Sequence, residues 1–501
     1  MAISPSQVSA IVGYQLQPGN FSPATPNLPQ RIMIIGEAND TNQDFDETQA
    51  KEITSAAQAG AVYGFGSPIH QMMRILRPVT GGGVGTIPTL VFAQKEDAGA
   101  SANSFEIGIS GTATGNATHE LIINGRNGVD GQFYTFNVAE GDGASEISQK
   151  ISDAINSVIG SPVSGSVATN DAVGTTKWKA STANELDVKV NTRDSDVGIT
   201  YAVTINTDGA GEPDLSDFQS NFGEEWTTIV LSGYGLANDT VNDLLEGING
   251  FPFKNNPTQR FAGAWNPFQA IAGTTAEDPT ALTEARKNQL TIHAAYAPKS
   301  DGAHWEAAAN YGRLFAVNNE NTPHLDIKGL LLPDMPTPTD IGISAKQDER
   351  NNLVLKGCST VELSAGTYKI VDFVSTYHPE DESLPQWRFA RVLVIDMNVR
   401  FAVLLRERQN VLDHAIAADD DVVVQPRVMK PKYWKSVLAD LAVQLSRRAL
   451  IADPDFMIES IEVDIDTTNP DRINAEFRYK RTGFVRISST VATAGFNFGT
   501  L

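Results

Sequence analysis

A cluster of glycines, Gly81–Gly85, is the segment of this 501-residue sequence that comes nearest to a phosphate-binding loop. A phosphate loop requires a lysine and then a serine or threonine after the glycines, and a dinucleotide loop has to open a helix. Here Thr86-Ile87-Pro88 and a strand-like run follow. Ser110 and Ser232, each followed by glycine, lack the flanking residues of a nucleophile turn. The sequence therefore predicts no nucleotide site and no local nucleophile motif, although a triad dispersed over an α/β fold would leave no such motif.

Side chains that bind metals are also poorly placed for that chemistry. The seven histidines show no paired spacing, and the single cysteine, Cys358, favours neither a structural zinc site nor an internal disulfide. Asp419–Asp421 precedes three valines, which favours a charged turn before a strand over a carboxylate metal site. His324 and Asp326 lie close together in a predicted loop and are interpreted as solvated surface. We therefore expect no catalytic residue, no metal and no cofactor.

The overall charge excludes some classes of partner. The chain has 38 basic and 60 acidic residues, a formal net charge of −22, which disfavours binding to nucleic acid. No apolar run approaches the ~20 residues of a membrane span, and residues 1–9 lack the basic and apolar regions of a signal peptide. We expect a soluble protein made in the cytoplasm, with no membrane insertion.

Basic residues gather on one predicted helix in the last quarter of the chain. Lys430, Lys432 and Lys435 stand at its start, and Arg447 and Arg448 stand near its end. Arginines in a last turn suit the helix dipole, whereas lysines in a first turn oppose it, at a cost of roughly a few tenths of a kcal/mol. That cost predicts an anionic neighbour. We interpret the set as part of an interface, the alternative being an ordinary solvated face.

The first part of the chain alternates strand-like and helix-like patterns. Residues 100–207 interrupt this alternation, which then resumes. Short apolar runs alternate with helical patterns in residues 31–99 and again in residues 208–370, which predicts one α/β domain split by an insertion. The predicted strands are 32–35, 90–93, 227–231 and 291–295; the predicted helices are 48–59, one starting at Ser67-Pro68, 239–248, one starting at Asp278-Pro279, and 304–317.

The inserted residues 100–207 are rich in Gly, Ser, Thr and Asn and contain short alternating runs. Strands at such intervals predict a small β-sandwich or barrel on the outside of the α/β domain, with one amphipathic helix over 145–158. The predicted strands are 105–109, 120–123, 133–138, 186–190 and 199–205.

Residues 371–487 predict an α+β domain, and each end of the chain predicts an extended arm. Helices are expected over 387–412 and 431–451, the alternative for the first being a strand, which Val392, Val394, Ile395 and Val399 would also suit. A half-buried hairpin over 461–465 and 473–479 is expected to follow. Arms 1–30 and 488–501 each contain a candidate strand without a partner nearby in sequence, and for the first arm a disordered leader is the alternative. The arm residues assigned to these strands are Gln7, Val8, Ala10, Val12, Tyr14, Val491, Phe496 and Phe498.

Taken in order, these segments resemble the tail sheath proteins of contractile-tailed bacteriophages, especially the Mu-like branch. The resemblance is carried by the proline-rich lead into RIMIIGEA, by AVYGFGSPIHQMMR, by YKIVDFVSTYHP and by the C-terminal NPDRINAEFRYKRTGFVRISSTVATAGF. It covers nearly the whole chain, and the insertion is its least comparable part.

The resemblance implies a degenerate, subtilisin-like α/β domain without a catalytic triad, an outer β insertion and a C-terminal domain that lines the tail tube. It also implies arms that add strands to the sheets of neighbouring subunits, in a helical stack of hexameric rings that contracts to drive the tube through the host envelope. Further implied partners are the tail tube, baseplate and tail terminator proteins, with assembly in the host cytoplasm and a final location in the virion tail. The five basic residues are predicted to face the tube.

Two other functions stay open on the sequence alone. An α/β hydrolase-like enzyme with a β accessory domain would need a pocket with converging titratable groups. A glycan-binding virion surface protein would use residues 100–207. The sequence also leaves open whether the particle is an infectious phage or a headless bacteriocin.

Overall fold

The computed structural model describes residues 26–193, 195–222, 227–248, 268–380 and 386–494. By their contacts these residues form two compact units, which we call the small unit (described residues 26–27 and 401–480) and the large unit (described residues within 28–400 and 481–494). Helix α9 (Ala390–Asn410) continues from one unit into the other. The five-part domain division expected from the sequence stays a prediction.

The large unit is built on a parallel sheet whose strands are short and fully buried, as continuous apolar runs require. Its strand order is β15-β14-β13-β1-β3, with the two-residue β2 (Lys51–Glu52) antiparallel at the edge. The four predicted strands are confirmed, while β14, with a glycine and little periodicity, was not predicted. The parallel strands are β1 (Ile32–Glu37), β3 (Thr89–Gln94), β13 (Ile229–Ser232), β14 (Gln269–Thr274) and β15 (Ile292–Tyr296).

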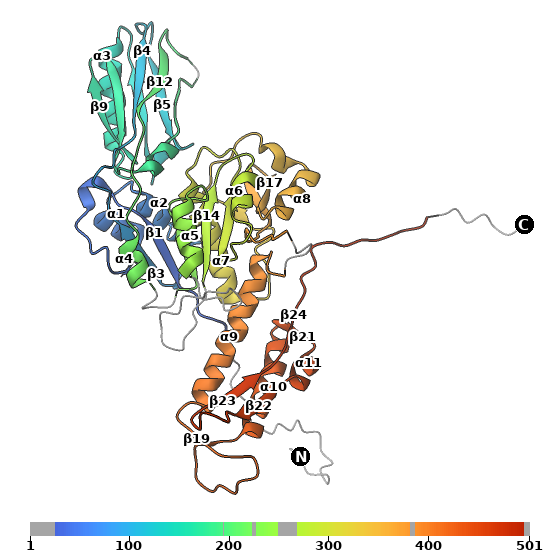
Figure 1. Cartoon of the computed structure of the whole chain (residues 1–501). Coiled ribbons are helices and arrows are strands. Elements are labelled where there is room, and N and C mark those ends of the chain that lie inside the picture. Colours follow the sequence, from blue (N-terminus) through green and yellow to red (C-terminus); the bar gives the residue numbers. More distant parts are fainter. Residues whose placement is uncertain (1–25, 194, 223–226, 249–267, 381–385, 495–501) are drawn as a thin grey trace, which may run out of the picture. The chain divides into compact units, whose positions relative to one another are not determined.

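Alternate side chains of β1 enter two separate cores, one on each face of the sheet. Ile32 and Ile34 join the core that is covered by α1, α2 and α7. Met33 and Ile35 join the core that is covered by α4 and α5, and Figure 1 shows these helices on the two faces. The helices are α1 (Ala56–Tyr63), α2 (Pro68–Leu76), α4 (Ser216–Asn221), α5 (Asp239–Ile248), α6 (Thr280–Ala285) and α7 (His304–Asn321).

Two serines set where the first helices begin. The Ser67 hydroxyl accepts from the His70 backbone N–H at the start of α2, which confirms the predicted Ser-Pro start. The helix predicted over 48–59 is wrong at both ends: Ser55 caps α1 through the Gln58 backbone N–H, so the helix begins at Ala56 and ends at Tyr63. A short 3₁₀ turn, η1 (Asp40–Asn42), and β2 occupy part of the preceding stretch.

Close packing of α7 on β14 depends on Gly273. A Cβ atom at this position would lie 1.8 Å from the carbonyl oxygen of His304. We therefore expect Gly273→Ala to lower the free energy of unfolding by about 3 kcal/mol, because sheet and helix would have to separate. Gly247→Ala in α5 is the matched control: a Cβ there meets nothing within 4 Å. Urea unfolding should leave this control unchanged or slightly stabilised, and equal midpoints for the two variants would contradict the packing argument.

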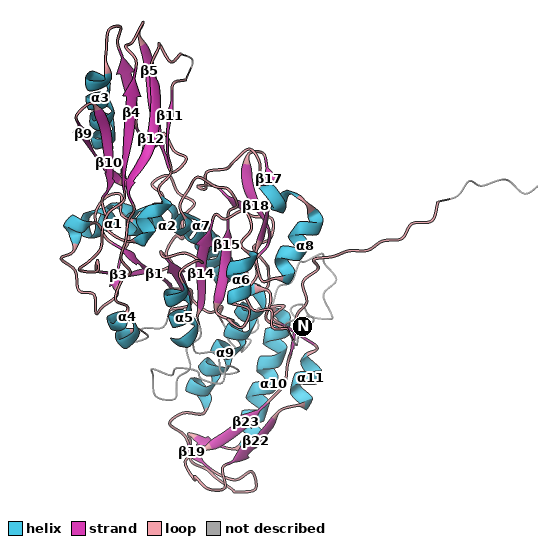
Figure 2. Cartoon of the chain, turned by 45° about the horizontal axis from the view of Figure 1, so that its top comes forward, coloured by secondary structure: helices cyan, strands magenta, loops and turns pink. Residues whose placement is uncertain are grey.

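Between β3 and β13 the chain builds an inserted lobe with its own core (Figure 2). A four-stranded antiparallel sheet, β12-β4-β10-β9, and a three-stranded one, β11-β5-β8, enclose apolar residues together with α3 (Ala144–Ser157). Strands β9 and β10 were not predicted, since their Gly/Ser/Thr-rich sequences carry little apolar signal. The strands are β4 (Ser104–Ser110), β5 (Ala117–Ile123), β6 (Gly128–Val129), β7 (Gln132–Phe133), β8 (Thr135–Val138), β9 (Val163–Ala168), β10 (Asp171–Thr176), β11 (Val188–Asn191) and β12 (Thr200–Thr207).

The rest of the large unit is a small antiparallel sheet with one short helix beside it. Strands β16 (Leu331–Leu332), β18 (Thr367–Asp372) and β17 (Thr360–Ser364) pair in that order, near η3 (Gly342–Ala345) and α8 (Gln347–Leu355). Cys358 is buried and forms no disulfide, as expected from a single cysteine.

The small unit contains α10 (Pro431–Arg447), α11 (Pro454–Glu459) and a hairpin of β22 (Glu462–Ile465) with β23 (Ile473–Glu476). The strand expected at 422–424 is wrong: Val422 and Val424 are more than nine-tenths exposed in a loop between β19 (Ala415–Ile416) and β20 (Val428–Met429). Two further short strands are β21 (Ile451–Ala452) and β24 (Lys480–Arg481).

The candidate arm strands fall largely outside the described residues, as do Gln7, Val8, Ala10, Val12, Tyr14, Phe496 and Phe498. Residues 488–494 are described and form no helix or strand, and Val491 is 92% exposed.

Candidate functional site

The order of the parallel strands indicates where a ligand would bind in a fold of this kind. Numbered along the chain, the five strands run 2-1-3-4-5, the order of doubly wound sheets, which bind ligands beyond the carboxyl ends of the strands where the order reverses. Here that position lies beyond β1 and β13. Glu37 ends β1, and Gly233 follows β13.

The base of the inserted lobe covers this position. Thr182, in the 3₁₀ turn η2 (Ser181–Glu185), donates its hydroxyl proton to the Glu37 carboxylate. Glu185 of the same turn lies 3.2 Å from Nδ1 of His304, whose Nε2 is 3.0 Å from the carbonyl oxygen of Gly233. The chain's own side chains therefore occupy the place that a substrate takes in enzymes with this sheet order.

Two buried tryptophans complete the cover. Trp178 precedes η2 and donates through Nε1 to the Thr182 hydroxyl at 3.0 Å, and its ring meets that of Trp305 edge to face with centroids 5.7 Å apart. Trp305 lies in α7 and donates to Oε1 of Gln71 in α2 at 3.1 Å. The insertion base, α7 and α2 are thus joined through one buried polar and aromatic network.

Burial changes the ionisation of Glu37. Its side chain is removed from water, and this desolvation raises its pKa from 4.5 to about 8, with the nearby carboxylates Glu212 and Glu96 adding to the shift and the Thr182 hydrogen bond opposing it. Glu37 is therefore mostly protonated at neutral pH, as a buried carboxyl group with no cationic partner among the described residues should be.

This shift predicts a pH-dependent stability. Because the folded-state pKa is raised, the contribution of Glu37 is fully present below about pH 4.5 and is lost as the pH rises towards 8. Glu37→Gln should match the parent chain at about pH 4 and exceed its free energy of unfolding by about 2–4 kcal/mol at about pH 9. Urea unfolding across this range measures the difference, with exposed Glu140→Gln as the control; parallel curves for parent and Glu37→Gln would contradict the assignment.

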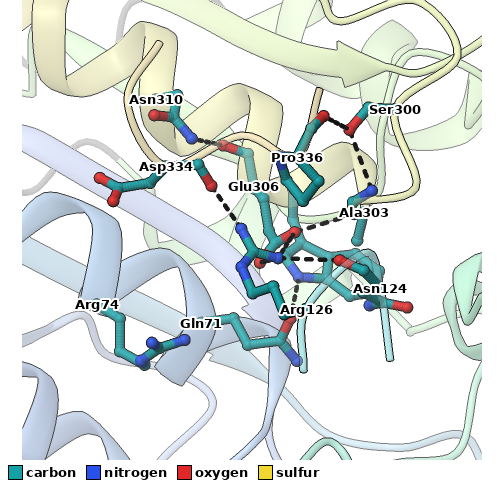
Figure 3. Close-up of polar contacts among 12 residues, drawn as sticks. Gln71, Arg74, Asn124, Arg126, Ser300, Ala303, Glu306, Asn310, Asp334 and Pro336 are labelled. Atoms are coloured by element: carbon teal, nitrogen blue, oxygen red, sulfur yellow. Dashed lines mark hydrogen bonds and ion pairs between the residues drawn. The ribbon is translucent and has the colours of Figure 1, made fainter. Parts of the chain in front are cut away.

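A second set of contacts, drawn in Figure 3, fixes the insertion to α7. The Arg126 guanidinium, from the inserted lobe, lies 2.8 Å from the buried Glu306 carboxylate and also donates to the carbonyl oxygens of Asn124 and Asp334. Glu306 in turn accepts from the Ala303 backbone N–H at 3.1 Å, which caps α7. The adjoining pocket of about 300 Å³, lined in part by Arg74 and Pro336, is therefore a structural junction with its charges already paired.

The predicted basic set lies on α10, but the structure divides it. Lys430 directs its ammonium to the carbonyl oxygens of Asp419 and Asp421, and Arg448 donates to the side-chain oxygen of Asn27. The Asp419 carboxylate accepts from the Lys432 backbone N–H at 2.9 Å. Part of the anionic neighbour inferred from the sequence is thus supplied by the chain itself, since Asp419 stabilises the first turn of the helix.

The other three cations remain on the outer face of α10. Lys432, Lys435 and Arg447 are exposed and, at 100° per residue, lie within a stripe about 120° wide. The opposite face is buried, as the predicted helical spacing required; it consists of Trp434, Leu438, Leu441, Ala442 and Leu445.

Within the described residues, no group of three or more histidine, cysteine, aspartate or glutamate side chains could hold a metal ion. Nor does any described helix combine the length and apolarity needed to cross a membrane. Asp326, interpreted from the sequence as solvated, is only 2% exposed at its side chain and pairs with Arg486. Sequence reasoning missed this pair and also Glu37, whose only signal was an acidic residue at the end of an apolar run.

The described fold is thus a mixed α/β protein with several sheets and an insertion that covers the edge where other sheets of this strand order bind ligands. No family model matches the sequence. The Mu-like prophage FluMu tail sheath protein of Haemophilus influenzae is 25% identical over 461 residues, covering 90% of this chain and 89% of that protein. This homologue confirms the predicted resemblance to tail sheath proteins of Mu-like phages.

Two solved structures are similar to the chain at lower sequence identity. A sheath tail protein from Desulfitobacterium hafniense shows 9% identity and a TM-score of 0.44, covering 94% of this chain and all of that one. The anti-feeding prophage baseplate, 6-fold symmetrised, also shows 9% identity and a TM-score of 0.44, covering 98% of this chain and all of that one.

Proposed function

We propose that this chain is the structural sheath protein of a contractile tail, which polymerises around a tail tube and shortens to drive the tube through the host envelope. The observation that carries this proposal is the relationship to a Mu-like prophage tail sheath protein over nine-tenths of both chains. The protein would act in the virion tail, after the tail has assembled in the host cytoplasm. The tail tube, baseplate and tail terminator proteins are the proposed partners.

The architecture proposed for the large unit is a non-catalytic, subtilisin-like α/β domain with the inserted lobe on the outside of the tail. The covered edge of the sheet supports a structural role, because Thr182 and Glu185 of the insertion fill the position that a substrate would need. The tryptophan pair and Arg126 hold the insertion on the α/β core, so the two would move together when subunits change neighbours.

Subunits would be joined through exchanged strands. The hairpin β22–β23 has only two strands in the described chain, and a two-stranded sheet is marginal alone. The uncharged C-terminal segment 488–501 and the N-terminal segment Gln7–Leu16 are the proposed additional strands, donated by neighbouring chains. About four hydrogen bonds per strand at ~1 kcal/mol each would give a junction of several kcal/mol, enough to persist while other contacts rearrange. Head-to-tail contacts that do not close would extend the array as a helix.

The exposed cations of α10 are proposed to face an acidic tube surface. Lys432, Lys435 and Arg447 support this assignment because they share one face and because, within the described residues, their side chains make none of the internal contacts that engage Lys430 and Arg448. Such a polar contact is weak for each subunit and can be released on contraction.

Negative-stain electron microscopy of the purified chain tests the proposal. Tubes or rings are expected from a sheath protein, whereas an α/β hydrolase-like enzyme or a glycan-binding surface protein would give discrete particles. Discrete particles at every salt concentration and protein concentration would overturn the proposal.

A further inference from the structure

The segment that follows the small unit, residues 481–487, is extended and has two different sides. Thr482, Phe484 and Arg486 are partly buried, whereas Val485 and Ile487 are 83% and 88% exposed. From residue 488 to residue 494 every side chain is exposed and no helix or strand forms. Within the described residues, the chain is therefore held along one side up to Arg486, and residues 488–494 beyond it are exposed.

Arginines make the first contacts along this segment. The Arg481 guanidinium binds both carboxylate oxygens of Asp396 in α9, at 2.7 and 2.8 Å. Arg391, also in α9, donates to the carbonyl oxygen of Thr482 at 2.8 Å, and its guanidinium lies 5.5 Å from the ring centroid of Phe484. Bidentate arginine–carboxylate pairs fix orientation as well as position.

Within the described residues, Arg486 makes the last of these contacts. It pairs with Asp326 and, at 3.2 Å, with Asp372, which ends β18. Its guanidinium lies 3.7 Å from the ring centroid of Phe389 and 5.3 Å from that of Phe484. Asp326 is 2% exposed and Arg486 13% exposed at the side chain, so removal of the arginine would leave a buried carboxylate with less compensation.

We propose that Arg391, Arg481 and Arg486, which we call the arginine clamp, position the C-terminal arm by fixing the point where it leaves the large unit. This inference rests on the proposed function, since the arm matters only if it joins a neighbouring chain. Arg486 is the last positioning residue in the described part of the chain, so any pull from a neighbour on residues 488–501 would reach the large unit there. Without Arg486, the point at which the arm leaves the large unit would be mobile. Movement of a neighbouring subunit would then be passed to the large unit less effectively.

Limited chymotryptic proteolysis of the full chain tests the local part of this proposal. Arg486→Met should accelerate cleavage after the partly buried Phe484 by about tenfold or more, while Arg486→Lys, which keeps the charge, should lie between it and the parent. Arg478→Met is the matched control, because Arg478 is exposed and has no ion pair within the described residues. If Arg486→Met fails to fold, Asp326→Asn/Arg486→Met removes the unpaired carboxylate. Unchanged cleavage after Phe484 in the folded variant would overturn the proposal.

Electron microscopy of assembled and contracted sheaths tests the role of the clamp in assembly. We expect Arg486→Met to give sheaths that are shorter or that break on contraction, whereas Arg478→Met sheaths should match the parent. Arg486→Met sheaths of parental length that contract intact would overturn the clamp while leaving the proposed function in place. A parent chain that forms no sheath would instead show that the proposed function itself is wrong, and the inference would fail with it.

Discussion

Deletion of residues 1–20 is expected to leave a soluble monomer that cannot polymerise. The deleted stretch contains Gln7–Leu16, the strand that a neighbouring subunit would receive, and each lost strand removes about four inter-chain hydrogen bonds. Sedimentation velocity of the truncated and parent chains at equal concentration measures the effect, with the polymer fraction expected to fall by about a hundredfold or more.

The fold itself should survive this deletion, because the contacts that the structure describes begin at Asn27, after the deleted residues. The Leu28 backbone N–H donates to the Asn398 side chain at 3.0 Å, and the Gln30 backbone N–H donates to Glu320 at 2.6 Å. Deletion of residues 1–6, which spares the candidate strand, is the matched control and should polymerise normally. Polymers of the 1–20 deletion at parental yield would refute the arm assignment.

Charge reversal on the outer face of α10 should have the second largest effect. Lys432→Glu/Lys435→Glu is expected to reduce the yield of sheaths that enclose a tube by about tenfold or more, because each subunit would repel an acidic tube surface. Self-polymerisation without the tube should continue, since the arms are intact. Counting filled and empty sheaths in micrographs of chain co-expressed with its tube protein gives the measurement.

Loss of the helix would not explain such a result. Acidic side chains near a helix N-terminus are favourable by about 0.3–1 kcal/mol, so the reversal places the new charges where the dipole favours them, although Asp419 nearby offsets part of this gain. Lys328→Glu/Lys356→Glu changes the net charge equally on exposed residues of the large unit and is the control. Filled sheaths at parental yield in the α10 variant would refute the tube-facing assignment.

The sequence predicted elements well wherever burial follows a simple period. The apolar run at 32–35 has to be a strand with both faces covered, and the spacing of Trp434, Leu438, Leu441 and Leu445 can bury one face only as a helix. Strand β14 was missed because its position between β13 and β15, rather than its own sequence, stabilises it.

Residues whose roles arise from tertiary contacts could not be predicted in the same way. Glu37 differs from any other strand-ending glutamate only because η2 of a distant insertion covers it. Arg486 stands in an unpatterned tail, and its partners Asp326 and Asp372 lie more than a hundred residues away. The first-turn lysines of α10 did predict an anionic neighbour, but spacing could not show that Asp419 supplies part of it.

A cryo-electron microscopy map of the polymer will show whether neighbouring chains are joined by exchanged terminal strands. We expect the hairpin β22–β23 of one subunit to carry further strands whose density traces to residues 7–16 and 488–501 of its neighbours. A polymer in which these segments fold back on their own subunit, with the hairpin left two-stranded, would contradict this expectation.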